Sequence, residues 1–353
     1  MRRSCTGIIV GAISVAAGLG VSCAPAVASE PLPALGADIR QTSVSGLSSG
    51  AYMAGQFQLA HAEIVVGAAI VAAGPYGCAE SEASRWLGGT ATNLTMALNA
   101  CMQARLLNLG YPNATTLARR AEGRAGRGEI GPLEAIRRQR VLVFSGTLDE
   151  VVVPAVVRAT AAFYRAIGLP EAAVKLVADV PAGHAFVSRR AERACAHSGA
   201  PYLVNCDYDL AGVLLRHIHG PLKLPAKTPN GRFFKFDQTR YAAAGALMAR
   251  EGVVYVPANC SVRSGCRIHV AYHGCRQALE HVGMTFVERS GIARWADTNR
   301  MVVLFPQMRS TTPNPRACWD WWGYTGTDFL TRAAPQISAV RAMIDRLAAT
   351  ARR

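Results

Sequence analysis

The stretch GLSSG at positions 46–50 contains the residues best suited to nucleophilic chemistry. Read as G-x-S-x-G, it places Gly46 and Gly50 on either side of Ser48. This is the pattern of a nucleophile elbow, where a serine occupies a strained turn between a strand and a helix. Centring the pattern on Ser49 would lose both glycines. We therefore predict Ser48 as the nucleophile and the backbone N–H of Ser49 as an oxyanion-hole donor, although G-x-S-x-G also occurs in ordinary turns.

A serine attacks efficiently only when a base takes its proton, and the base needs an acid to orient it. In SGTLDEVVVP, Asp149 follows an apolar strand and a turn, with Glu150 as the adjacent alternative. In VPAGHAFV, His184 lies on a glycine-led loop after another strand. Of the eight histidines, only His184 combines such a loop with the chain order Ser, Asp, His. We predict Ser48, Asp149 and His184 as a catalytic triad.

A second oxyanion donor is expected on a strand that most α/β-hydrolases place before the elbow and end in His-Gly. Here RIHVAYHGC at 267–275 ends in His273, Gly274 and Cys275, far beyond His184, and a further apolar strand follows at 300–307. We predict that Cys275 supplies the second N–H and is bonded to Cys318. The alternative is a plain turn at the end of a strand. The matching strand that follows favours a circularly permuted α/β-hydrolase.

The segment NPRACWDWWGYTG contains Trp319, Trp321 and Trp322, three of only five tryptophans in the chain. Tryptophans in a Pro/Gly-rich loop suit the wall of a cleft for an apolar ligand, although they also fit a core. We predict that this loop, together with His273, contacts the substrate.

The elements that must position these residues alternate between apolar strands and amphipathic helices, which predicts an α/β fold. Strands are expected within the segments 63–74, 140–149, 173–184, 252–260, 267–275 and 300–307, and helices at 155–168, 278–299 (with a glycine break) and 336–351. We expect a mostly parallel sheet flanked by helices. The chain is predicted to form one domain, 29–353, with insertions over the sheet at 79–135 and 190–250.

The N-terminal segment 1–28 resembles a signal peptide, with Arg2 and Arg3, an apolar stretch and the cleavage site Ala26-Val27-Ala28. A membrane anchor is the alternative, but the apolar run is shorter than the ~20 residues of a span. Eight cysteines follow this segment, which fits a disulfide set in an exported protein. Pairing in sequence order is the simplest expectation, because short loops close most easily. The cysteines concerned are Cys78, Cys101, Cys195, Cys206, Cys260, Cys266, Cys275 and Cys318.

The formal net charge of +15 allows nucleic-acid binding as one interpretation. The basic residues are scattered, however, and no basic run is interleaved with aromatics, so a solvated surface is the better interpretation. The chain has no CxxC pair and no His/Cys cluster with zinc spacing. We predict no metal, no cofactor, no nucleic-acid partner and, after signal cleavage, no membrane anchor.

The motifs SVSGLSSGAYMA, SGTLDEVVVP, VPAGHAF, NCDYDLAG, HGCRQ and CWDWWG, in this order, resemble the single-domain, circularly permuted polyhydroxybutyrate depolymerases related to the fungal enzyme. This resemblance implies hydrolysis of poly(3-hydroxybutyrate) esters through an acyl-serine. It implies Ser48 as nucleophile, His184 as base, Asp149 as the orienting acid and Ser49 and Cys275 as oxyanion donors. A tryptophan of the Trp319–Trp322 loop would contact the substrate.

Many secreted depolymerases carry a linker and a polymer-binding domain, and neither is visible here. We therefore expect action on amorphous polymer or oligomers by a monomer that is secreted to the periplasm or the medium. A feruloyl or acetyl esterase of decorated polysaccharides would use the same scaffold, since a fold does not determine its substrate. A non-catalytic exported binding protein is the alternative from another class, and it would need a triad member to be missing.

Overall fold

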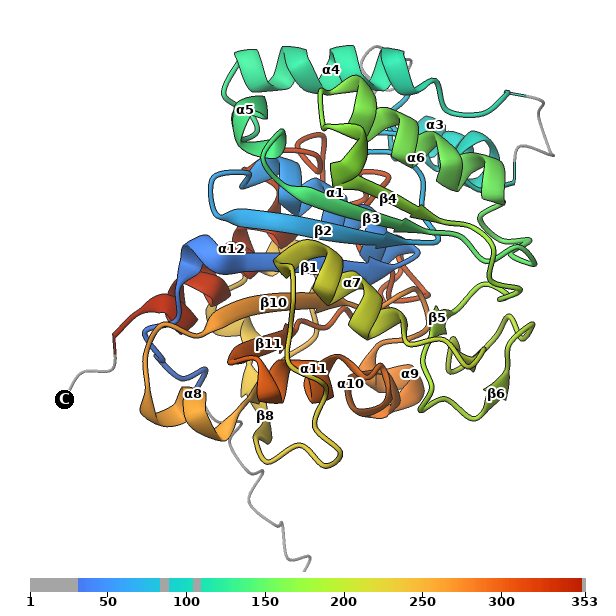
Figure 1. Cartoon of the computed structure of the whole chain (residues 1–353). Helices are drawn as coiled ribbons and strands as arrows, with labels where there is room; N and C mark the ends of the chain where they lie inside the picture. The colour runs from blue at the N-terminus through green and yellow to red at the C-terminus, as the bar shows by residue number, and fades with distance from the viewer. Residues whose placement is uncertain (1–30, 83–88, 104–108, 351–353) are drawn as a thin grey trace, which may run out of the picture.

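The computed structural model describes residues 31–82, 89–103 and 109–350, and its largest element is a mixed eight-stranded sheet (Figure 1). The strand order is β4-β3-β2-β1-β10-β11-β9-β8, with β9 antiparallel to both of its neighbours and the other pairs parallel. The strands are β1 (Thr42–Leu47), β2 (Val65–Val71), β3 (Arg140–Phe144), β4 (Val174–Val177), β8 (Arg232–Asp237), β9 (Glu251–Val256), β10 (Arg267–Tyr272) and β11 (Met301–Phe305). A small second sheet contains β5 (Phe186–Val187), β7 (Leu203–Asn205) and β6 (Arg193–Ala194).

The centre of the large sheet joins segments that are far apart in the sequence. Strand β1 pairs in parallel with β10, so that Thr42 lies opposite Ile268. Strands β10 and β11, which most α/β-hydrolases place ahead of the elbow, thus follow it in the chain as predicted, with β10 next to β1 and β11 next to β10. The predicted α/β fold with a circularly permuted strand order is confirmed.

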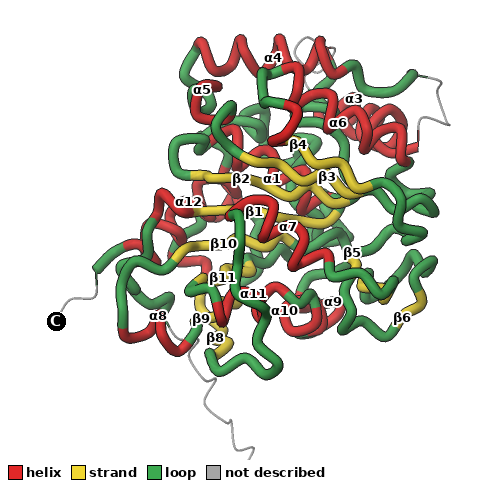
Figure 2. Tube along the Cα trace, in the orientation of Figure 1, coloured by secondary structure: helices red, strands yellow, loops and turns green. Residues whose placement is uncertain are grey.

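Helices cover both faces of the sheet (Figure 2). Helices α1, α6 and α12 pack on one face, and α7 and α11 pack on the other, where α7 contacts β2 and β3. The helices are α1 (Ser49–Ala60), α3 (Thr90–Leu98), α4 (Ala114–Gly126), α5 (Leu133–Ile136), α6 (Pro154–Ala166), α7 (Leu210–His219), α8 (Ala258–Val262), α9 (Leu279–Val282), α10 (Thr285–Arg289), α11 (Ile292–Thr298) and α12 (Pro335–Ala348). Short turns of helix are η1 (Ile39–Gln41), η2 (Asn99–Gln103), η3 (Glu171–Ala173), η4 (Gln238–Arg240) and η5 (Ala244–Ala246).

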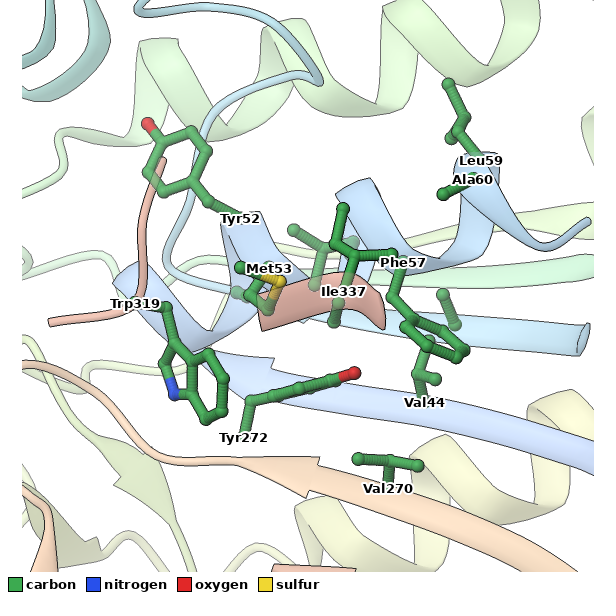
Figure 3. Packing of buried hydrophobic residues seen from close by; sticks show 14 of the residues in the cluster. Val44, Tyr52, Met53, Phe57, Leu59, Ala60, Val270, Tyr272, Trp319 and Ile337 are labelled. Atoms are coloured by element: carbon green, nitrogen blue, oxygen red, sulfur yellow. The ribbon is translucent and has the colours of Figure 1, made fainter. Parts of the chain in front are cut away.

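The central strands are apolar along their whole length because both of their faces are covered. Successive side chains point to opposite faces, so Val270 joins the hydrophobic core under α1 and α12 while Ala271 joins the core under α7 and α11. Figure 3 shows Val44, Phe57 and Ile337 packed together in the first of these cores. A sheet covered in this way leaves only the ends of its strands, and the loops that follow them, for a functional site.

Two expectations about local organisation need correction. The segment 190–250 is more than an insertion, because α7 packs on the sheet and β8 forms its edge. Strand β8 was not predicted, because RFFKFD is an edge strand with only one fully buried residue and does not have the pattern of a buried strand. The predicted helix 278–299 is divided into three, since Gly283 and Gly291 have positive φ angles of 57° and 85°.

The termini and crosslinks complete the fold. The predicted signal peptide at 1–28 lies outside the described residues and remains a prediction. Within the described ranges, no helix has both the length and the apolar character needed to cross a membrane. Four disulfides join the eight cysteines in sequence order, as Cys78–Cys101, Cys195–Cys206, Cys260–Cys266 and Cys275–Cys318.

Candidate active site

Ser48 occupies a tight turn between β1 and α1. Its φ of 55° and ψ of −122° are unusual for a residue with a Cβ, and strain of this kind costs on the order of 1–3 kcal/mol. The two flanking glycines explain how the turn is possible. A Cβ on Gly46 would lie 2.2 Å from the carbonyl oxygen of Gly50, and a Cβ on Gly50 would lie 2.3 Å from that of His273. The sterics therefore agree with Ser48, not Ser49, as the centre of the pattern.

The loops that follow β1 to β4 are joined at the carboxyl edge of the sheet by backbone hydrogen bonds. Ser48 donates to the Val71 carbonyl over 2.9 Å, Ala72 donates to Phe144, and Ser145 donates to Val177. The carboxyl ends of adjacent parallel strands thus bring the loops of Ser48, Asp149 and His184 to one edge.

Asp149 and His184 are in direct contact. The carboxylate oxygen Oδ2 of Asp149 accepts a hydrogen bond from Nδ1 of His184 over 2.8 Å. The other oxygen, Oδ1, accepts the backbone N–H groups of Val151 and Val152 over 2.8 and 2.9 Å. Both side chains are almost fully buried, which strengthens their interaction by excluding water. Glu150, the alternative acid, is exposed and makes no hydrogen bond to His184.

The loop of His184 is held by residues that sequence reasoning missed. The His184 backbone N–H donates to Ser198 Oγ over 2.8 Å, and Gly183 donates to the carbonyl of Cys195 over 3.0 Å. A Cβ on Gly183 would lie 2.4 Å from that Ser198 Oγ, so the glycine is required for this close approach. No sequence signal marks Ser198, because its role depends on a loop that returns to His184 only in the folded chain.

The hydroxyl of Ser48 makes no hydrogen bond to any described residue, His184 included. Hydrogen bonds between a nucleophile and its base are often long in the unliganded state and tighten when substrate binds. The Asp149–His184 pair is therefore assembled in this structure, while the Ser48 hydroxyl is free to turn.

Two backbone N–H groups beside Ser48 are also without a partner among the described residues. Ser49 is the first residue of α1, where a helix leaves its N–H unsatisfied. In the loop after β10, Gly274 donates to Gln277 Oε1 and Arg276 donates to the Arg316 carbonyl, while the Cys275 N–H makes no hydrogen bond. Ser49 and Cys275 are thus free to donate to a ligand.

A cavity of about 270 Å³ opens at Ser48 and Cys275. Its wall is mostly apolar and includes Tyr52, Leu98, Met102, Val152, Trp321 and Trp322. Trp321 stacks on Tyr52, with ring centroids 4.1 Å apart and planes 6° apart. Within the described ranges, no three His, Cys, Asp or Glu side chains come close enough to hold a metal ion.

The tryptophan loop is held in place by the buried carboxylate of Asp320. Its oxygens accept hydrogen bonds from the backbone N–H groups of Gly323, Tyr324 and Thr325 and from the Thr325 hydroxyl, over 2.6–3.0 Å. Burial raises the pKa of this carboxyl, and the hydrogen bonds act in the opposite direction. Asp320 thus fixes the backbone directly after Trp321 and Trp322.

Two predicted substrate contacts are wrong, because Trp319 and His273 are fully buried. Trp319 packs edge-on against Tyr272 in the hydrophobic core (Figure 3). His273 uses Nδ1 to donate to the Gly274 carbonyl and Nε2 to accept from the Met308 N–H. Burial lowers the pKa of His273 to about 4, so this ring is neutral. Its hydrogen bond to the Gly274 carbonyl helps to fix the loop that carries Cys275.

Known proteins resemble this chain in sequence. A poly(3-hydroxybutyrate) depolymerase of Delftia acidovorans is 38% identical over 321 residues, which cover 90% of this chain but only 61% of that relative. A polyhydroxybutyrate depolymerase of Talaromyces funiculosus is 32% identical over 332 residues, covering 89% of this chain and 91% of the relative. No protein-family model matches the chain.

Solved structures also resemble the fold. A serine-to-alanine variant of a PHB depolymerase complexed with an R3HB trimer has a TM-score of 0.80, and the PHB depolymerase from Penicillium funiculosum has a TM-score of 0.79. Both are 29% identical to this chain, cover 90% of it and are themselves covered over 99%. The sequence match to the Talaromyces protein extends over nearly the whole of both chains. The chain therefore belongs to the polyhydroxybutyrate depolymerase family.

Proposed function

We propose that this protein is a serine esterase that hydrolyses the ester bonds of poly(3-hydroxybutyrate), as amorphous polymer or as oligomers. The observation that carries the proposal is the buried Asp149–His184 pair, which lies at the same carboxyl edge of the sheet as the strained Ser48 turn, where Ser48 lines an apolar cavity. The relatives named as depolymerases and the neighbour complexed with an R3HB trimer support the same substrate class.

The proposed chemistry begins with attack of Ser48 Oγ on the ester carbonyl carbon while His184 Nε2 takes the hydroxyl proton. The Asp149 carboxylate holds the ring with Nδ1 protonated and stabilises the imidazolium that forms. The N–H groups of Ser49 and Cys275 donate to the carbonyl oxygen as it becomes negative. His184 then gives its proton to the departing alcohol, and a water molecule, activated by the same histidine, hydrolyses the acyl-serine.

The apolar surroundings of the site fit a polyester, which has methyl side groups and no charge along the chain. The structure exposes seven large hydrophobic side chains among its described residues. Leu94 and Leu98 line the cavity, Tyr111 and Leu148 line a depression at Asp149, and Leu109 lines a third depression together with Tyr111. We call these five the apolar rim, and they are Leu94, Leu98, Leu109, Tyr111 and Leu148. Exposed apolar groups clustered at a site indicate an apolar ligand.

The substrate class is tested by comparing kcat/KM for an (R)-3-hydroxybutyrate trimer with that for feruloyl and acetyl sugar esters. We expect the trimer to be preferred by about 100-fold or more, since an apolar wall leaves sugar hydroxyls without hydrogen-bond partners. A preparation carrying Ser48→Ala measures background hydrolysis. Faster release of ferulate or acetate would favour the polysaccharide esterase, and no turnover of any ester by the folded protein would favour a binding protein.

The apolar rim is tested by Tyr111→Ser, because Tyr111 is 56% exposed and does not line the cavity at Ser48. Loss of about 1 kcal/mol of apolar contact is expected to weaken adsorption to amorphous polymer about fivefold. Hydrolysis of the soluble trimer should change little. The matched control is Leu224→Ser, which removes a 77% exposed leucine outside the rim. Equal adsorption by both variants would contradict a role for the rim.

We further propose that the protein is exported as a monomer, after cleavage of the segment 1–28. Four disulfides support export, because such bonds form and persist in oxidising compartments.

A further inference from the structure

Gln277 is a buried polar side chain close to the cavity at Ser48, and the chemistry described above does not use it. It lies two residues after Cys275 and is 1% exposed. Its Oε1 accepts the Gly274 N–H over 2.8 Å, and its Nε2 donates to the carbonyls of Pro201 and Tyr202 over 3.0 and 3.1 Å. Only one orientation of the amide satisfies all three partners, because Gly274 offers a donor and the other two offer acceptors.

One end of this side chain fixes the loop that presents the Cys275 N–H. The Gly274 N–H is bonded to Gln277 Oε1, and the Gly274 carbonyl accepts from His273 Nδ1 and from the Gln277 backbone. Both polar groups of the residue before Cys275 are therefore occupied. The orientation of the peptide that carries the free N–H depends directly on this arrangement.

The other end of the side chain reaches the segment that holds His184. The Tyr202 carbonyl that accepts from Gln277 also accepts the N–H of Phe186, over 2.9 Å. Phe186 is two residues beyond His184, and Ser198, four residues before Tyr202, accepts the His184 backbone N–H. One glutamine thus connects the loop of the oxyanion donor to the loop of the base.

We infer that Gln277 is a positioning residue that sets the Cys275 N–H relative to His184, so that oxyanion stabilisation and proton transfer act on the same ester. This inference rests on the proposed function. Gln277 itself touches neither the cavity nor the reacting atoms, and its effect passes through Gly274 and Tyr202. A misplaced donor weakens binding of the developing oxyanion more than it weakens binding of the uncharged ester.

The test uses Gln277→Met, which keeps a similar length without hydrogen bonds, and Gln277→Glu, which keeps an acceptor for Gly274 and removes both donors. Removing an oxyanion donor costs about 10²–10³-fold in kcat, so displacing one is expected to cost about 10- to 100-fold. With p-nitrophenyl butyrate and the hydroxybutyrate trimer as substrates, we expect kcat to fall and KM to change by less than about threefold. A merely structural role would lower the melting temperature without lowering kcat selectively over KM.

The matched control is Gln139→Met. Gln139 is also buried, donates to the Ala62 carbonyl over 2.9 Å and accepts from Gln58 over 2.8 Å. It directly precedes β3, so it lies at the amino ends of the parallel strands, whereas Ser48 lies at their carboxyl ends. We expect this variant to lower the melting temperature and leave kcat unchanged.

A second readout is inhibition by an alkyl boronic acid, which accepts the Ser48 oxygen to form a tetrahedral adduct while the proton passes to His184. We expect its Ki to rise with the loss of kcat/KM in the Gln277 variants, and the Ki of 3-hydroxybutyrate to stay constant. The inference would be overturned by any of three results: a folded Gln277 variant with unchanged kcat, a Gln139→Met variant that loses as much kcat as the Gln277 variants, or two Gln277 variants that both fail to fold. A parent protein inactive on every ester would instead overturn the proposed function.

Discussion

Replacing Ser48 by alanine is expected to lower kcat on hydroxybutyrate oligomers by about 10⁵-fold or more, since removal of the nucleophile eliminates the acyl-enzyme route. Folding should be preserved, because Ser48 Oγ makes no hydrogen bond to a described residue. The backbone at φ 55° stays strained with alanine as with serine, so the melting temperature is expected to change little. The measurement is kcat on the trimer, with the melting temperature as a check of folding.

Ser49→Ala is the matched control for this experiment. The Ser49 hydroxyl only accepts the backbone N–H of Trp319, over 3.3 Å, and the backbone N–H of Ser49 assigned to the oxyanion is unaffected by the substitution. We expect a loss of less than about tenfold, below the 10²–10³-fold cost of removing an oxyanion donor. A fluorophosphonate should label the parent on Ser48. Near-normal turnover by Ser48→Ala together with an inactive Ser49→Ala would show that Ser49 is the nucleophile.

Replacing Asp149 by asparagine is expected to lower kcat by about 10⁴-fold, the cost of the equivalent change in a serine protease. The hydrogen bonds around Asp149 provide the reason. The amide oxygen of asparagine must take the place of Oδ1, which accepts the N–H groups of Val151 and Val152. Its NH₂ group would then donate to His184 Nδ1, which places the ring proton on Nε2. A protonated Nε2 cannot accept the proton of the Ser48 hydroxyl.

The two backbone hydrogen bonds should survive in Asp149→Asn, so a large loss of kcat is expected with a small change in melting temperature. Glu150→Gln is the matched control, because Glu150 is the adjacent carboxylate and is exposed. We expect it to retain kcat within about threefold, as is usual for surface substitutions. A larger loss for Glu150→Gln than for Asp149→Asn would show that the acid is misassigned.

Much of the fold could be predicted because apolar strands that are buried on both faces are distinctive in sequence. The segments around Val270 and Val303 could be predicted as strands for this reason. The permuted order was predicted from the ending His273-Gly274-Cys275, which follows His184 in the chain and does not precede the elbow. The edge strand β8 was missed, because an edge strand with exposed positions lacks that pattern.

The sequence by itself determined the centre of the elbow, because the steric constraint on Gly46 is local. A side chain on Gly46 would collide with the carbonyl of Gly50, four residues further along the chain, whereas a side chain on Gly50 would collide with the carbonyl of His273, which only the tertiary structure brings close. The placement of the loops of Ser48, Asp149 and His184 at one end of the sheet could also be predicted from the sequence, since each loop follows a strand and parallel strands present their carboxyl ends at the same end of a sheet.

Only the tertiary structure decided which neighbouring side chains face the cavity. Trp319 and Trp321 are two residues apart, yet one is fully buried against Tyr272 and the other stacks on Tyr52 at the cavity wall. The link from Gln277 to Tyr202 likewise spans 75 residues of the chain. Burial and long-range hydrogen bonds depend on which distant segments pack together, and no local pattern of residue types records that.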